Sequence, residues 1–241
     1  YIKKVLNKDY KWTAADNNVK DDPKAKNVYE LIHNEFSPYW EIDKTYHNAS
    51  GLDAVLFKSK SALPILPDGL VHVLAIRGTK GSADVANDGV ITAGQDPKQG
   101  QEIEEIIKEI GIREEIKNFY ITGHSLGGYL TQRAVVKLNR LANEENGNWI
   151  DSAAMKYRNF YNNVFKKATT FNAPKINASR ISGDLYKKSI LSKQLAKQGK
   201  IKHYGMRGDK FIGLLYNDPD VMTYIEGGEH SSNAYFSAML N

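Results

Sequence analysis

A serine stands at the centre of the segment best suited to chemistry. Residues 123–127 read Gly-His-Ser-Leu-Gly, a match to Gly-x-Ser-x-Gly, and another glycine follows at position 128. An apolar run at 119–122 precedes the motif, and a helical pattern over 126–141 follows it. In such a strand–turn–helix unit the glycines leave room for a serine on a strained bend, and the helix N-terminus stabilises developing negative charge. The pattern therefore predicts that Ser125 is a nucleophile.

The histidine base is expected after this serine in the chain. A serine hydroxyl needs a histidine to accept its proton, and the order with this motif is serine, acid, histidine. Of the six histidines, only His203 and His230 satisfy that order. His230 follows Glu-Gly-Gly-Glu, a loop-like sequence, whereas His203 lies inside an apparent strand. We predict His230 as the base; the alternative is that it is a surface loop histidine.

Four aspartates after the serine are candidates for the carboxylate that orients the base. Asp209 comes directly after an apparent strand at 203–206, and residues that follow parallel strands meet at one edge of a sheet. Asp218 and Asp220 flank a proline and fit a turn, and Asp184 fits a helix start. We predict Asp209, with the Asp218/Asp220 pair as the alternative.

Two backbone amides are expected to hold the oxyanion of the tetrahedral intermediate. One is the amide of Leu126, directly after the nucleophile. The other is expected in a loop after an earlier strand, and Thr79 follows the most apolar run, 70–76, through Arg-Gly. A plain strand-to-loop transition is the alternative at this position. This chemistry needs no metal or organic cofactor.

Strand-like and helix-like segments alternate along the chain. The strand-like ones are 52–57, 70–76, 119–122, 168–171, 203–206 and 221–225, and the helix-like ones are 23–36, 103–110, 126–141, 176–200 and 231–240. Alternation without an internal repeat predicts a three-layer α/β fold with a mostly parallel central sheet. We expect one domain over residues 1–241, with a possible N-terminal arm at 1–22 and a helical insertion at 143–167.

Composition narrows the classes of function. The 241 residues include no cysteine, which excludes disulfides, thiolate catalysis and Cys-ligated zinc. The net charge is +5, but the lysines are scattered, so we expect no nucleic-acid partner and at most peripheral contact with lipid surfaces. The chain has no apolar run of the roughly 18 residues that a transmembrane helix needs.

Several motifs together resemble the class 3 lipase family of α/β-hydrolases. They are Ile-Arg-Gly-Thr at 76–79, Gly-His-Ser-Leu-Gly-Gly at 123–128, Thr-Phe-Asn-Ala-Pro at 170–174, Gly-Asp at 208–209 and the final His230. The Asn-Ala-Pro form and the ending at 230–236 look closest to bacterial lipase and phospholipase A1-like members. The resemblance covers roughly residue 52 to the C-terminus.

The resemblance implies hydrolysis of carboxylic esters of lipids on an α/β-hydrolase fold. It implies a triad of Ser125, Asp209 and His230, and an oxyanion hole at Thr79 and Leu126. Phospholipase A activity is the alternative within this class, and a non-catalytic binding module on the same fold is the alternative outside it. Because many resembling lipases are exported, we expect a secreted or cell-envelope protein.

One loop departs from the family pattern. Lipases of this family often carry a short hydrophobic lid after the oxyanion strand, but residues 80–98 are polar and rich in glycine. Asp84 and Asp88 in this loop resemble loop-fixing aspartates of relatives. An aromatic stretch at 149–165 is a candidate cover for the site, and a helix packed on the core is the alternative for it.

Overall fold

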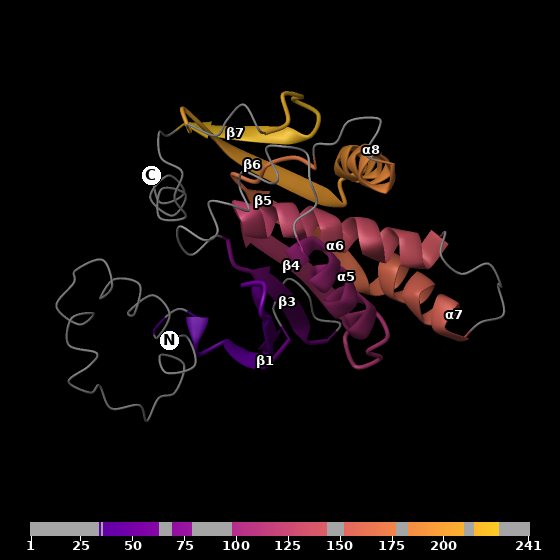
Figure 1. Ribbon diagram of the computed structural model, residues 1–241. Coiled ribbons are helices and arrows are strands. Elements are labelled where there is room, and N and C mark those ends of the chain that lie inside the picture. The colour runs from indigo at the N-terminus through magenta and orange to yellow at the C-terminus, as the bar shows by residue number, and fades with distance from the viewer. Residues whose placement is uncertain are drawn as a thin grey trace.

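The computed structural model describes residues 34, 36–62, 69–78, 98–143, 152–176, 183–209 and 215–226. Their frame is a seven-stranded sheet in the order β1-β2-β3-β4-β5-β6-β7 (Figure 1). The strands are β1 Trp40–His47, β2 Asp53–Ser59, β3 Val71–Ile76, β4 Asn118–His124, β5 Phe165–Phe171, β6 Ile201–Arg207 and β7 Met222–Glu226.

The sheet is mostly parallel, as the sequence predicts. Strand β2 pairs antiparallel with both β1 and β3, and every pair from β3 to β7 is parallel. The carboxyl ends of these five strands therefore meet along one edge, which we call the carboxyl edge. The α/β class is thus confirmed.

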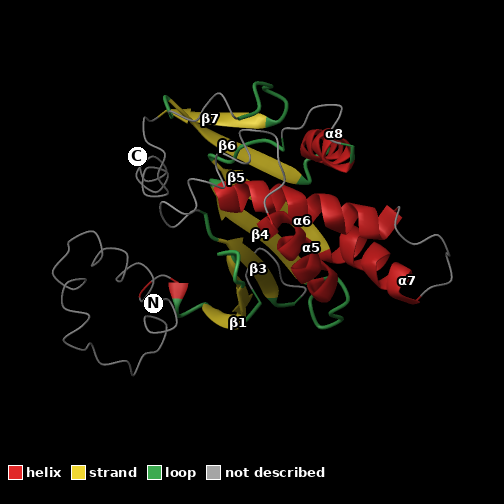
Figure 2. Ribbon diagram, in the orientation of Figure 1, coloured by secondary structure: helices red, strands yellow, loops and turns green. Residues whose placement is uncertain are grey.

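Four described α-helices accompany the sheet. They are α5 Lys98–Ile110, α6 Leu126–Asn143, α7 Ser152–Asn159 and α8 Asp184–Lys197, and a π-helical turn, η3 Phe160–Val164, leads into β5. Helix α6 packs on β3, β4 and β5, with α5 and α8 on its flanks (Figure 2). Consecutive parallel strands joined by right-handed crossovers place their helices on one face, which explains this layer. No helix within the described ranges is both long and apolar enough to cross a membrane.

Helical spacing accounts for the packing of this layer. In α5, Ile103, Ile107 and Ile110 recur every three to four residues and are buried, and Gly111 follows the last of them. Helix α6 is buried on nearly all sides because it lies between the sheet and its two neighbouring helices. The nucleophile motif therefore opens the most enclosed helix of the described structure.

The sequence prediction missed one strand and placed the start of another three residues too late. Strand β1 was not predicted, and its pairing with β2 shifts register between Ile42 and Lys44, which breaks the alternation that marks a strand. Strand β5 begins at Phe165 rather than at 168, inside the predicted insertion at 143–167. Phe165 is only 1% exposed, and its ring lies 6.4 Å from that of Phe119 on β4, so packing extends the strand.

The predicted arm at 1–22 and the terminal helix at 231–240 lie outside the described residues. So does most of the segment 23–36. The described helices all pack around α6 on one face of the sheet. The described residues therefore supply two of the three expected layers, the sheet and one layer of helices.

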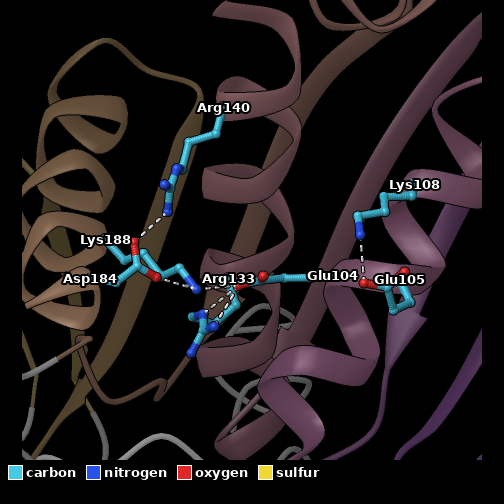
Figure 3. Close-up of polar contacts among 7 residues, drawn as sticks. All are labelled: Glu104, Glu105, Lys108, Arg133, Arg140, Asp184 and Lys188. Carbon is cyan, nitrogen blue, oxygen red and sulfur yellow. Dashed lines mark hydrogen bonds and ion pairs between the residues drawn. The ribbon is translucent and has the colours of Figure 1, made fainter. Parts of the chain in front are cut away.

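An ionic cluster ties the helices of this layer together (Figure 3). At its centre, Glu104 of α5 accepts hydrogen bonds from Arg133 of α6 at 2.5 Å and from Lys188 of α8 at 2.9 Å. Asp184 extends the cluster to Lys188 at 3.0 Å and to Arg140 at 2.7 Å. The Arg133 side chain is fully buried, so its charge depends on Glu104 for compensation.

Candidate active site

Ser125 occupies a strained bend between β4 and α6. Its φ is +54°, in the left-handed region that non-glycine residues seldom adopt. A Cβ on Gly123 would overlap the backbone of Gly127, and a Cβ on Gly127 would overlap the backbone of Ile76 and Arg77. The two glycines therefore permit a bend too tight for side chains, and this is the local geometry that the motif predicts.

Backbone hydrogen bonds fix the serine at the start of α6. The Ser125 N–H donates to the carbonyl of Phe171 on β5 at 2.9 Å, and the Ser125 carbonyl accepts the Tyr129 N–H at 3.1 Å. The next residue, Leu126, is the first of an 18-residue helix. Amides in a first helical turn have no partner within the helix, and their N–H groups give the helix N-terminus a positive potential that favours an anion. Leu126, the predicted oxyanion donor, thus lies in the first turn of a helix.

The chain that leaves β3 passes directly beside Ser125. A Cβ built on Gly78 would lie 2.7 Å from the carbonyl oxygen of His124 and 3.4 Å from the Cβ of Ser125. Arg77 holds this strand end, because its N–H donates to the carbonyl of Asp53 at 3.0 Å and its guanidinium pairs with the Asp53 carboxylate. Thr79, the other predicted oxyanion donor, is the next residue and lies outside the described residues.

Asp209 lies at the carboxyl edge, two strands from Ser125. It follows β6 and is only 2% exposed, and its N–H donates to the carbonyl of Met206 at 3.2 Å. Asp218 and Asp220 instead precede β7, and Asp218 pairs with Lys193 at 2.9 Å. Asp184 belongs to the ionic cluster. The described geometry thus places Asp209 at the same sheet edge as Ser125 and places Asp184, Asp218 and Asp220 elsewhere.

His203, the alternative base, is enclosed beneath the helical layer. It is 0% exposed, its Nδ1 lies 2.6 Å from the Thr170 hydroxyl, and its ring lies 4.9 Å from that of Tyr216. Burial lowers the pKa of His203 to about 4, so the ring is neutral at physiological pH. This packing argues against His203 as the base. His230 lies outside the described residues.

Asn172 also lies at this edge. It belongs to the Thr-Phe-Asn-Ala-Pro motif, but the sequence alone assigns it no role. It follows β5 directly, has a φ of +43°, and is 0% exposed. Its side-chain oxygen accepts the N–H of Met206 at 2.7 Å. An asparagine directly after a strand is the signal, because asparagine tolerates left-handed backbone and bonds to nearby main chain.

Metal-binding groups do not gather in the part of the chain that the structure describes. No three histidine or acidic side chains in those residues lie together as a metal ion would require.

Comparisons with known proteins are sparse. No family model and no curated protein matches the sequence. Among solved structures, the chain is similar to one described as the crystal structure of M37 lipase, with 17% sequence identity and a TM-score of 0.43. The match covers 78% of this chain and 62% of that chain, so it spans less than two thirds of the lipase.

Proposed function

We propose that this chain is a serine hydrolase that cleaves carboxylic esters of lipids through a triad of Ser125, His230 and Asp209. The observation that carries the proposal is the bend at Ser125. A non-glycine residue at a φ of +54° is held there by backbone contacts of its flanking glycines, at the carboxyl edge and at a helix N-terminus. Strain of this kind persists where the strained position has a use.

Strand spacing supports the proposed partners. Neighbouring strands lie about 4.8 Å apart, so Asp209 and Ser125 project from positions about 10 Å apart, a gap that their side chains and an imidazole bridge. His230 comes four residues after Glu226, which pairs with Arg207 at the carboxyl end of β7. Four extended residues span up to about 14 Å, and Ser125 is three strands away, so His230 is within reach.

The proposed reaction passes through an acyl-enzyme. His230 takes the proton of Ser125 as the hydroxyl oxygen attacks the ester carbonyl carbon, and the amides of Leu126 and Thr79 bind the resulting oxyanion. The intermediate collapses, the alcohol leaves with the proton from His230, and the acyl group stays on Ser125. Water, deprotonated by His230, then releases the acid, while Asp209 stays ionised and orients the imidazole.

The lipid nature of the substrate is supported by the motifs shared with class 3 lipases. The excess of positive charge, +5, is compatible with peripheral contact with anionic lipid surfaces, and this favours phospholipids as the alternative substrate. We therefore propose lipase or esterase activity first, and phospholipase A activity as the second candidate.

A soluble p-nitrophenyl ester assay tests the nucleophile. We expect Ser125→Ala to lower turnover by about 10⁴- to 10⁶-fold, because both the nucleophile and the acyl-enzyme are lost. Ser152→Ala, at an exposed residue of α7, is the matched control and should leave turnover unchanged. Equal turnover in wild type and Ser125→Ala would refute the proposal.

A fluorophosphonate probe separates an enzyme from a binding module on the same fold. We expect mass spectrometry to find the probe on Ser125 of wild type and no labelling of Ser125→Ala. Folded wild-type protein that stays unlabelled would favour the non-catalytic alternative.

A lipid panel then assigns the substrate class. Release of fatty acid from triacylglycerol vesicles or emulsions would support a lipase, and preferential release from phospholipid vesicles would support phospholipase A. Turnover of short soluble esters alone would contradict a lipid substrate while leaving the serine chemistry intact.

A further inference from the structure

Hydrogen bonds connect the nucleophile's strand to the next two strands along the carboxyl edge. The Ser125 N–H donates to the carbonyl of Phe171 at the end of β5. The following residue, Asn172, donates its N–H to the carbonyl of Tyr204 on β6 at 2.8 Å. The ends of β4, β5 and β6 are thus linked in sequence, and Asn172 makes the step from β5 to β6.

The Asn172 side chain replaces a bond of the parallel ladder. In such a ladder, a residue whose N–H donates to one neighbour accepts, through its own carbonyl, from the residue two positions further along that neighbour. The expected donor to Asn172 is therefore the N–H of Met206. At a φ of +43° the backbone of Asn172 leaves the strand, and its side-chain Oδ1 accepts this N–H at 2.7 Å. Strand β5 can therefore end while β6 continues to Arg207.

This substitute bond lies at the base of the turn that presents Asp209. The N–H of Asp209 returns to the carbonyl of Met206 at 3.2 Å, through Gly208 at a φ of +94°. Met206 is 1% exposed and Asn172 is 0% exposed, so water does not replace the amide when it is removed. A buried N–H that loses its acceptor destabilises its surroundings more than an exposed one does. The position of Asp209 therefore depends on how firmly Met206 is held.

We infer that Asn172 is a positioning residue: its side-chain amide holds the end of β6 so that the turn at 207–209 presents the Asp209 carboxylate to the catalytic base. This inference rests on the proposed function, and it assigns a role to the Asn of the Thr-Phe-Asn-Ala-Pro motif. Asn172 acts through Asp209 and takes no part in bond making.

Asn172→Gly tests the side-chain amide separately from the backbone conformation. Glycine adopts positive φ freely, so the variant keeps the bend and removes the acceptor of the Met206 N–H. We expect kcat to fall about 10²-fold at unchanged KM, as a misplaced orienting group gives. We also expect the acidic limb of the pH profile of kcat/KM to move to lower pH, because a displaced carboxylate no longer raises the pKa of the imidazole.

Asn118→Gly is the matched control. Asn118 is also buried, at 4% exposed, but it begins β4 at the end of the strand opposite Ser125. This variant should lose thermal stability without a change in kcat or in the pH profile. An equal fall of kcat in both variants would mean that Asn172 only stabilises the fold, which contradicts the inference. Wild-type kinetics in Asn172→Gly would also contradict it.

Amide hydrogen exchange measures the same bond without activity. We expect Asn172→Gly to lose protection at the amides of Met206 and Asp209, and Asn118→Gly to retain it. Unchanged protection would overturn the inference. If wild type shows no turnover that depends on Ser125, the proposed function fails, and the exchange data still decide whether Asn172 holds the end of β6.

Discussion

The carboxyl edge and the ionic cluster bury polar groups in opposite ways. At the carboxyl edge, backbone amides, one asparagine side chain and two positive φ values fix the ends of the strands. In the ionic cluster, Glu104, Arg133 and Lys188 join three helices through full charges (Figure 3). The ends of β4 to β6 are joined by neutral groups in strained geometry, with the ion pairs Arg77–Asp53 and Arg207–Glu226 on either side of them, whereas the ionic cluster joins ordinary helices through charges.

The pKa of Glu104 shows what this difference means chemically. Burial alone raises its pKa, but Arg133 and Lys188 outweigh burial and hold the pKa below its ordinary value. A carboxylate so placed is fixed as an anion and compensated by cations of the cluster. The backbone of Asp209, in contrast, is positioned through hydrogen bonds between neutral groups, and its carboxylate is the one that we propose to orient an imidazole.

Asp209→Asn should give the largest effect on the carboxyl edge. We expect kcat to fall about 10⁴-fold with little change in unfolding temperature, because the amide is isosteric but no longer stabilises a charged imidazole. Asp218→Asn removes the same charge before β7 and should retain kcat. Steady-state kinetics on both variants test this, and a larger loss in Asp218→Asn would transfer the role to that residue.

Arg133→Leu should show the converse pattern in the ionic cluster. We expect a loss of about 3 to 5 kcal/mol in the free energy of unfolding, since Glu104 stays buried without its main partner. The kcat of the folded fraction should stay unchanged, because Arg133 lies eight residues along α6 from Ser125, about two helical turns from the carboxyl edge. Urea unfolding and kinetics on the same samples measure the two quantities.

The double variant Arg133→Leu with Glu104→Gln is its control. Removing both charges should recover part of the stability, and Lys188 keeps Asp184 as a partner at 3.0 Å. A loss of kcat that follows the loss of stability in these variants would show that the two regions are coupled.

The sequence predicts the parts of this molecule that local rules control. The bend at Ser125 follows from its glycines, and six of the seven strands follow from apolar runs bounded by turns. The placement of Asp209 follows from a rule about parallel strands that needs only the order of the elements. Each of these inferences uses neighbours in the chain.

Features that depend on partners far along the chain could not be predicted. Arg133 looks like an ordinary exposed position of an amphipathic helix, and only the approach of α5 and α8 makes it a buried charge. Asn172 meets Met206 across a strand pair, 34 residues away in sequence. Strand β1 was missed because its bulge removes the alternation on which strand prediction depends. The roles of Ser125, Asp209 and His230 in a triad, and of Thr79 and Leu126 in an oxyanion hole, stay predictions.

His203 offers a smaller test that joins the two regions. It is a buried titratable group whose ring contacts the Thr170 hydroxyl and the Tyr216 ring, and burial lowers its pKa from 6.5 to about 4. The unfolded chain therefore binds a proton between these pH values and the folded protein does not. Stability from this group is complete above about pH 6.5, falls as the pH drops toward 4, and then levels off, a change of about 3 kcal/mol.

His203→Gln should remove this slope while keeping a partner for the Thr170 hydroxyl. Urea unfolding from pH 4 to pH 7 measures it. After the intrinsic cost of the substitution is subtracted, the two curves should coincide near pH 7, and the wild-type curve should fall below that of the variant toward pH 4. The pKa of His72 is also lowered, mainly by burial, but His72 is present in both proteins and cancels in their difference. Parallel curves would mean that the folded protein protonates His203 as readily as the unfolded chain does. The neutral packing beneath the carboxyl edge would then accept a charge, and the contrast with the ionic cluster would not hold.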